Sequence, residues 1–287
     1  GANFSGFAQN SAAAASQRLV NLSTRASAGT GDQVAIVGFV IAGLESKTVL
    51  VRAVGPTLRN FGLTTVLAAP RLDLMRGTTQ IATNTGWATS GNTAELAAAA
   101  ARSGAFALTA GSADSVIVTT LAPGAYSAIV SASDGLAGAA LVEVYDLSNE
   151  SPAQRLANLS TRANVGSGDA TLIAGLVVTG SVPKRMLIRA AGPALAQFGI
   201  ANALARPQLT VFSGNNSLDR NSGWSTAGTS SAEIADAAAR AGAFAFATGS
   251  ADAAIIINLA PGAYTAQVTS VTAGASGTAL VEIYELP

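Results

Sequence analysis

The chain contains no histidine and no cysteine among its 287 residues. Without histidine it cannot form a Ser-His-Asp triad, an imidazole base or a histidine-ligated zinc site. Without cysteine it has no thiol nucleophile, no iron–sulfur cluster and no disulfide framework. Many common routes to catalysis are therefore closed, and we expect a non-enzymatic protein with no catalytic residues, no cofactor and no bound metal.

Charge is scarce as well, because charged residues make up 11% of the chain, which is roughly half the usual share. Basic and acidic residues balance to a net charge of zero, so the basic surface that nucleic-acid binding requires is absent. The longest apolar runs, such as Val34–Ala42 and Thr171–Thr179, are strand-length, whereas a membrane helix needs about 20 apolar residues. We expect neither a nucleic-acid partner nor a membrane span.

The first residue is Gly1 rather than methionine, which is typical of a chain from which a signal peptide has been removed. A residue left at the N-terminus by an expression tag would look the same. The absence of cysteine does not favour the cytoplasm, since many exported bacterial proteins also lack it. We expect an exported protein, located outside the cell or on its surface.

An internal repeat is the strongest signal in the sequence. The segment Arg18-Leu-Val-Asn-Leu-Ser-Thr-Arg-Ala26 returns 137 positions later as Arg155-Leu-Ala-Asn-Leu-Ser-Thr-Arg-Ala163, and the match continues to the end of the chain. A period of this length is a whole domain rather than a solenoid unit. The repeat predicts a first module at residues 18–147, a polar linker at 148–154, a second module at 155–287 and an extra N-terminal arm at 1–17.

Short runs rich in Val, Ile and Tyr, bounded by turn residues, predict β-strands within each module. In the first module these runs are Val34–Ile41, Thr48–Val54, Val116–Thr120, Tyr126–Ala132 and Ala140–Tyr145. One alanine-rich helix per module is expected at Thr93–Ser103 and Ser230–Ala241, each followed by a glycine cap. The predicted fold is all-β, with two tandem homologous β-sandwich domains (jelly-roll or immunoglobulin-like), each with one short helix.

Charged residues within predicted strands mark candidate structural sites. Arg52 and Arg189 lie among apolar neighbours, as do Glu143 and Glu282. A glycosidase would need two carboxylates beside the substrate, and each module offers one here. We therefore predict two structural charge pairs, Arg52 with Glu143 and Arg189 with Glu282, because an unpaired charge in such a position would be costly.

Two further residue types recur at equivalent positions. Trp87 and Trp224 could stack on sugars, but a carbohydrate face normally needs several aromatics and this chain has 5%, so a core role is favoured. Four aspartates recur singly in turns, whereas calcium sites cluster several oxygen ligands in one loop. Capping of turns by these side chains is favoured, and a cation site assembled from separate loops stays open; the aspartates are Asp32, Asp114, Asp169 and Asp252.

The repeated motifs together resemble a β-module of exported bacterial surface proteins. They include the Arg-Leu-x-Asn-Leu-Ser-Thr-Arg-Ala segment, the Arg-Ala-x-Gly-Pro segment at Arg52 and Arg189, and the Leu-x-Pro-Gly-Ala-Tyr turn that ends at Tyr126 and Tyr264. The resemblance covers both modules. It implies fold and location, but it comes without an assigned chemistry and transfers no catalytic residue.

The N-terminal arm suggests how such a protein could act. Its first residues alternate between two faces as a strand does, with Phe7 as the exception, and Phe4 and Phe7 are its aromatic side chains. A short helical turn at Ala12–Ala15 is the alternative to a strand. We expect the arm to dock on a neighbouring subunit, which would make the chain a homopolymer, the structural subunit of an extracellular filament, fibre or surface layer assembled head to tail. The alternatives are an arm that packs on its own module, and a secreted module that binds carbohydrate or serves in adhesion.

Overall fold

The computed structural model describes residues 19–89, 91–147, 155–226 and 230–286. The predicted arm with Phe4 and Phe7, and the predicted linker at 148–154, lie outside the described residues. Within the described part the chain is mostly β, with sixteen strands, two α-helices and short 3-10 turns. The predicted all-β class is confirmed at this level.

Strand pairing arranges the sixteen strands in two sheets of eight, which are joined where β1 and β9 pair in parallel. One sheet has the order β5 (Thr79–Asn84), β4 (Pro70–Arg76), β7 (Gly124–Ala132), β2 (Ala35–Ala42), β9 (Arg155–Val165), β16 (Gly277–Glu285), β11 (Lys184–Ala191), β14 (Ala253–Leu259). The other has the order β13 (Asn216–Asn221), β12 (Pro207–Ser213), β15 (Gly262–Ser270), β10 (Leu172–Val178), β1 (Leu19–Ala28), β8 (Gly138–Asp146), β3 (Lys47–Val54), β6 (Ser115–Leu121).

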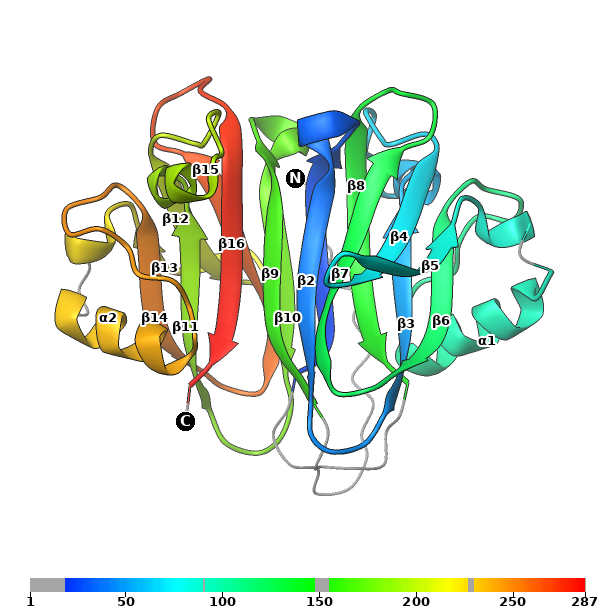
Figure 1. The fold of residues 1–287 in the computed structure, drawn as a ribbon, viewed down its shortest axis with the longest axis horizontal. Coiled ribbons are helices and arrows are strands. Elements are labelled where there is room, and N and C mark those ends of the chain that lie inside the picture. The colour runs from blue at the N-terminus through cyan, green and yellow to red at the C-terminus, as the bar shows by residue number, and fades with distance from the viewer. Residues whose placement is uncertain (1–18, 90, 148–154, 227–229, 287) are drawn as a thin grey trace.

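Each sheet contains strands of both sequence repeats, because the first strand of each repeat also pairs with the other repeat. β1 lies between β8 of its own repeat and β10 of the second. β9 lies between β16 of its own repeat and β2 of the first. The two halves of the molecule are thereby related by an approximate twofold axis along the strands, which runs vertically in Figure 1.

Side chains from the repeated motif meet on this axis. Thr24 of β1 and Thr161 of β9 are both fully buried, and their hydroxyl oxygens are 2.8 Å apart. Arg25, which is also buried, is attracted electrostatically by Asp169 in the 3-10 turn η4 (Gly168–Ala170) of the other repeat. The most closely matched segment of the repeat is therefore the place where the two repeats contact each other.

Two glycines allow the strands of the two repeats to pair closely. Ser160 of β9 lies over Gly38 of β2, where a Cβ would collide with its hydroxyl oxygen, and Ser23 of β1 lies over Gly175 of β10 in the same way. Glycine weakens a strand interior unless another group must approach closely. Here the approaching group is a serine of the other repeat, so the two glycines fit the contact between repeats.

This arrangement differs from the expected pair of separate sandwiches in tandem. β8 ends at Asp146 and β9 begins at Arg155, on either side of the predicted linker. Neither repeat closes its sheets alone, however, because β2 and β10 each take their second neighbour from the other repeat. Hydrophobic periodicity fixes which face of a strand is buried, but it does not choose the partner strand.

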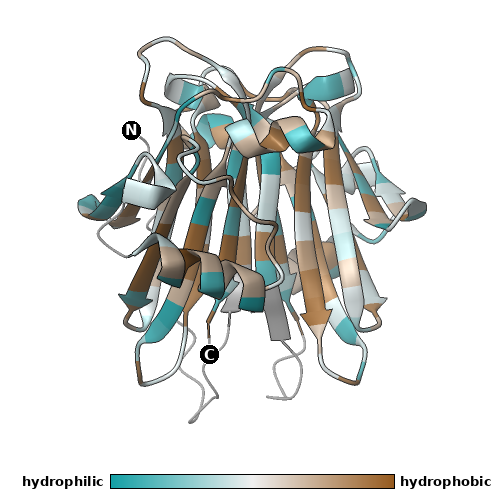
Figure 2. Ribbon diagram, turned by 60° about the vertical axis from the view of Figure 1, so that its left-hand side comes forward, coloured by the Kyte–Doolittle hydropathy of each residue, from teal (hydrophilic) through white to brown (hydrophobic). Residues whose placement is uncertain are grey.

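The main core lies between the two sheets. β2 alternates buried and half-buried residues along its whole length, as a strand with one covered face should, and Figure 2 shows polar and apolar bands alternating along the strands. The core is formed by Val, Leu, Ile and Ala side chains from both repeats, including Leu22, Val37, Leu159 and Leu176. Since this cluster is continuous across the twofold axis, the two repeats share one core.

One α-helix covers the outer side of each half. α1 (Thr93–Ser103) has the predicted bounds and ends at Gly104, whose positive φ of 76° allows the left-handed cap. α2 (Ser231–Arg240) starts after Ser230, whose hydroxyl accepts a hydrogen bond from the Glu233 amide. Neither helix has the length and apolar character needed to cross a bilayer, and the described residues contain no other α-helix.

Candidate functional site

The first predicted charge pair lies on the outer face of the sheet, beneath α1. Arg52 of β3 faces Glu143 of β8 in the register of the two strands. The Arg52 Nε donates to Glu143 Oε2 at 2.8 Å, its Nη2 is 2.6 Å from the same oxygen, and both side chains are 0% exposed. Tyr145 donates its hydroxyl to Glu143 Oε1 at 2.6 Å, so both carboxylate oxygens are bonded.

The second predicted pair occupies the equivalent place beneath α2 and is looser. Arg189 Nε is 3.5 Å from Glu282 Oε2, while Tyr284 donates to Glu282 Oε1 at 2.7 Å. The Arg189 Nη1 makes no hydrogen bond to any described residue. Burial raises the pKa of Glu282 above that of an ordinary glutamate, although Arg189 pulls it down, and burial lowers the pKa of Arg189.

The segment that follows each helix, residues 104–114 in the first repeat and 242–252 in the second, is called the strap below. It places aromatic rings over the arginine. In the first repeat, Arg52 Nη1 donates to the Phe106 carbonyl at 2.7 Å, and the guanidinium carbon is 4.5 Å from the centre of the Phe106 ring. In the second repeat, Arg189 Nη2 donates to the Phe244 carbonyl at 2.8 Å. Each arginine therefore ties the sheet to the strap through a charge pair, a backbone bond and a cation–π contact.

The strap is fixed at its far end by the aspartate of the Gly-Ser-Ala-Asp motif. Asp114 is completely buried, and its carboxylate accepts from the amide of Gly55 at 2.7 Å and from the hydroxyls of Thr57 and Ser112. In the second repeat, Asp252 accepts from two amides and a serine hydroxyl in the same way. These bonds cap the 3-10 turns η2 (Pro56–Phe61) and η5 (Pro193–Phe198). No group of three or more His, Cys, Asp or Glu side chains that could hold a metal occurs among the described residues.

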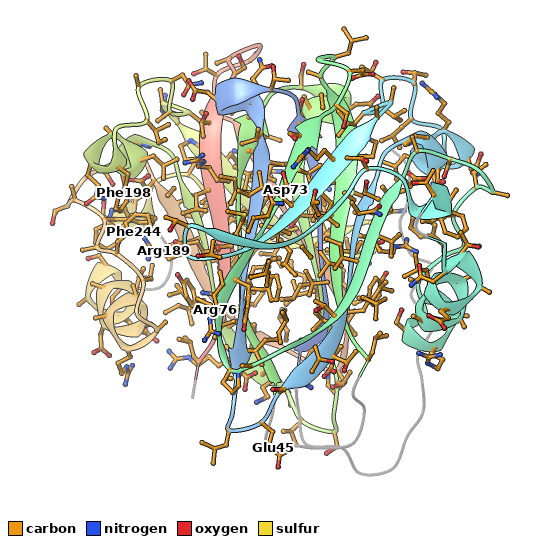
Figure 3. All side chains as sticks on the ribbon, turned by 45° about the vertical axis from the view of Figure 1, so that its right-hand side comes forward. Glu45, Asp73, Arg76, Arg189, Phe198 and Phe244 are labelled. Atoms are coloured by element: carbon orange, nitrogen blue, oxygen red, sulfur yellow. The ribbon has the colours of Figure 1, made fainter. Side chains whose placement is uncertain are left out.

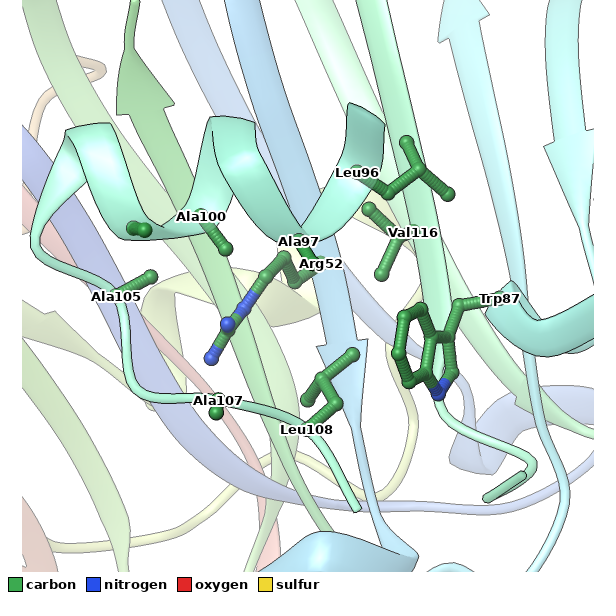
Figure 4. Close-up of a pocket in the computed structure, with 10 residues that line it drawn as sticks. Arg52, Trp87, Leu96, Ala97, Ala100, Ala105, Ala107, Leu108 and Val116 are labelled. Carbon is green, nitrogen blue, oxygen red and sulfur yellow. The ribbon is translucent and has the colours of Figure 1, made fainter. Parts of the chain in front are cut away.

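A small apolar pocket opens between helix and strap in each half. The pocket of the first repeat has a volume of about 100 Å³ (Figure 4), and its lining includes Arg52, Trp87, Leu96, Ala97, Leu108 and Val116. The second pocket is about 70 Å³, and its lining includes Arg189, Trp224, Ile234, Ala235, Ala238 and Phe246. Both volumes suit one side chain rather than an extended ligand.

Both tryptophans line these pockets rather than an open surface. Trp224 is buried in the cluster beneath α2, and its indole N–H donates to the Ala247 carbonyl at 3.0 Å. Trp87 is half-buried, and its indole N–H donates to the Ser112 hydroxyl at 3.1 Å. Each tryptophan therefore anchors its strap while presenting part of its ring to a pocket.

The two pockets differ at one position of the strap. Leu108 stands in the first repeat where Phe246 stands in the second. The guanidinium carbon of Arg189 is 3.8 Å from the centre of the Phe246 ring and 4.7 Å from that of Phe244. Arg189 thus contacts two aromatic rings, whereas the described cation–π contact of Arg52 is with Phe106.

The aromatic side chains continue outward to the surface. Phe198 is 57% exposed and lies edge-on to Phe244, with ring centres 5.0 Å apart, and Figure 3 shows both of them close to Arg189. Phe61 contacts Phe106 in the same way at 4.8 Å. This cluster was not predicted from the sequence, because its rings lie far apart in the chain. The Gly-Ala-Phe-Ala segment repeated after each helix was the available signal.

No protein-family model matches the chain, and neither does any curated protein. Among solved structures, tandem CBM51 modules of a family 98 glycoside hydrolase from Streptococcus pneumoniae give a TM-score of 0.24 at 6% identity, over 88% of this chain and 81% of that one. A structure of Sulfolobus turreted icosahedral virus gives 0.20 at 11% identity, over 94% and 89%. A DUF4785 family protein from Legionella pneumophila gives 0.22 at 8% identity, over 93% and 84%. Likenesses this weak carry no argument about function.

Proposed function

We propose that the chain is a structural subunit of an extracellular filament, fibre or surface layer, and that it assembles with copies of itself through the arm at residues 1–17. The observation that supports this proposal is the pairing of strands between the repeats, which makes one continuous body from two modules. The most deeply buried charged side chains, among them Arg52, Glu143, Lys47 and Asp146, bond to one another within this body. Removing one member of such a buried pair is costly, so these bonds hold the strands of the body to one another.

The proposal includes two homologous modules produced by duplication. Reciprocal pairing supports it, since β1 pairs with β10 as β9 pairs with β2. Such an interface uses the same surface on both partners and therefore closes after two modules. A filament cannot grow by repeating the contact between the modules, so growth must use a different surface. An arm that leaves one subunit and docks on the next gives a contact between unlike surfaces, and such contacts propagate.

Deleting the arm tests the proposal. Purified full-length chain is compared with a chain that lacks residues 1–17 by negative-stain microscopy, light scattering and circular dichroism. All described strands are present in both chains, so we expect the same circular dichroism spectrum, polymers from the full chain and monomers from the shortened one. If the shortened chain also formed polymers, the arm would not be the contact through which the subunits assemble. Failure of the full chain to polymerise over a range of concentrations and cations would reject the structural role.

The exposed phenylalanines favour a second candidate, a secreted carbohydrate-binding or adhesive module. Sugar rings stack on accessible aromatic faces, and Phe198 presents such a side chain beside Phe244 and Arg189. Pull-down on a panel of insoluble polysaccharides tests this candidate. Binding that is lost in Phe198→Ala, and retained when an exposed aliphatic residue such as Leu44 is replaced by alanine, would support it.

A further inference from the structure

The two pockets lie at equivalent places in the two repeats, but the protein's own side chains fill them to different extents. In the second repeat, the Phe246 ring lies against Arg189 and contacts Trp224 edge to face, with ring centres 6.2 Å apart. In the first repeat, Leu108 leaves a larger pocket, about 100 Å³ against about 70 Å³. The second repeat therefore shows which kind of side chain this environment accepts, namely an aromatic ring held between a tryptophan and an arginine.

We propose that the pocket of the first repeat binds a phenylalanine from the N-terminal arm of a neighbouring copy, Phe4 or Phe7, in the place that Phe246 has in the second repeat. This inference rests on the proposed function and names the surface that receives the arm. It assigns the larger pocket as the receptor. It also explains the asymmetry between the repeats, since a pocket that already holds its own ring has less room for another.

The chemistry of the arm suits this pocket. Residues 1–17 contain no charged side chain, and Phe4 and Phe7 are their only aromatic residues. Alanines form much of the pocket lining, and Ala97, Ala101 and Ala107 among them are exposed. Figure 4 shows Ala97 and Ala107 beside the pocket. An uncharged segment meets this surface without stripping water from a charge. A 17-residue segment spans up to roughly 60 Å when extended, which is enough to reach an adjacent molecule.

Peptide binding tests the pocket directly. The receptor is the full chain carrying Phe4→Ala, Phe7→Ala and Trp224→Phe, so that its own arm has no aromatic ring and Trp87 is its single tryptophan. The probe is a synthetic peptide of residues 1–17. We expect a saturable change in Trp87 emission with one peptide per chain. No saturable change, or an equal change with a peptide whose two phenylalanines are alanine, would overturn the inference.

The duplication supplies matched variants. Leu108→Phe introduces the ring that the second repeat already accommodates, so the chain should fold and should bind the peptide at least about tenfold more weakly, which is a readily measured difference in Kd. Phe246→Leu should instead enlarge the second pocket and raise the stoichiometry, measured by calorimetry, towards two peptides per chain. Ala97→Leu, a change at an exposed helix position, should also weaken binding, whereas the equivalent Ala235→Leu should not. Unchanged binding in both Leu108→Phe and Ala97→Leu would exclude this pocket.

Two measurements separate this inference from the proposed function. Assembly of the chain with its native arm is followed by light scattering, with and without Leu108→Phe. Polymers that form equally in both chains would reject this pocket and leave the structural role standing. Peptide binding without polymers at any concentration would reject the structural role and leave the pocket standing. Trp87 emission of a Trp224→Phe chain should also depend on protein concentration. Concentration-independent emission with a competent peptide site would place the arm on its own chain and overturn the contact between copies.

Discussion

Replacing Arg52 with methionine should be among the most destabilising single changes in the first repeat. The guanidinium bonds to Glu143 and to the Phe106 carbonyl, and it lies against the Phe106 ring. Methionine fills much of the same volume but provides none of these bonds. Glu143 would then be a buried carboxylate whose described partner is the Tyr145 hydroxyl.

The expected magnitude follows from the burial of both partners. Removing one member of a buried, hydrogen-bonded pair typically lowers the free energy of unfolding by about 3–5 kcal/mol, because the remaining charge is uncompensated. At about 2–4 °C per kcal/mol for a protein of this size, Tm should fall by about 6–20 °C. Urea unfolding followed by tryptophan fluorescence is a suitable assay, since Trp87 lines the same pocket as Arg52.

Two further variants control this experiment. Arg240→Met removes an exposed ion pair with Asp236 on α2 and should change the free energy of unfolding by about 0.5 kcal/mol or less. Adding Glu143→Gln to Arg52→Met should recover much of the loss, because the amide is neutral and still accepts from Tyr145. An Arg52→Met chain that melts within a degree of the parent would refute the reasoning, as would a double variant no more stable than the single one.

Four other results are expected. Arg189→Met should destabilise less than Arg52→Met in the same urea assay, because the Arg189–Glu282 pair is longer and burial raises the pKa of Glu282, so that this carboxylate is neutralised more readily once Arg189 is removed. The raised pKa of Glu282 means that the folded state binds more protons than the unfolded state at pH values between the two pKa values; the Tm of the parent relative to Glu282→Gln should therefore rise as pH falls from neutrality towards the ordinary pKa of a glutamate, and a constant difference would contradict this. Gly38→Ala should lower Tm through its collision with Ser160, and Ser160→Gly should restore it. Residues 155–287 alone should not form a stable monomer by circular dichroism and sedimentation, because β10 would lose β1 as its neighbour.

Much of the local structure could be predicted from the sequence. Val34–Ile41 and Thr48–Val54 agree with β2 and β3 to within a residue, since their β-branched residues alternate or run together as buried strands do. The helix at 93–103 was predicted to the residue from its alanines and its glycine cap. β4 was not predicted, because Arg71 and Asp73 interrupt its apolar residues; they lie on the less buried face and pair with each other.

The pairing of strands between repeats could not be predicted in this way. The side-chain period of two determines which residues of β2 are buried, but it is equally satisfied by a partner from either repeat. The pairing also leaves neither repeat with closed sheets of its own, which differs from the predicted pair of tandem sandwiches. The candidate site shows the same limit. The pairing of Arg52 with Glu143 could be predicted, because a charge within an apolar strand needs a partner. The position of the strap could not be predicted, because Asp114 holds it over the pair through hydrogen bonds to residues more than fifty positions away in the chain.

The twofold axis explains both the close match of one repeated motif and the divergence of the pockets. A residue near the axis meets its own equivalent, as Thr24 meets Thr161, so a change at one of the two positions leaves an unmatched hydroxyl buried in the core. A residue far from the axis contacts its own repeat, and one copy can change while the other is kept. Leu108 and Phe246 are such a pair of positions. Duplication therefore holds the centre of the molecule symmetric and leaves its two outer pockets free to differ, which is what a subunit needs if it is to present unlike surfaces to its neighbours.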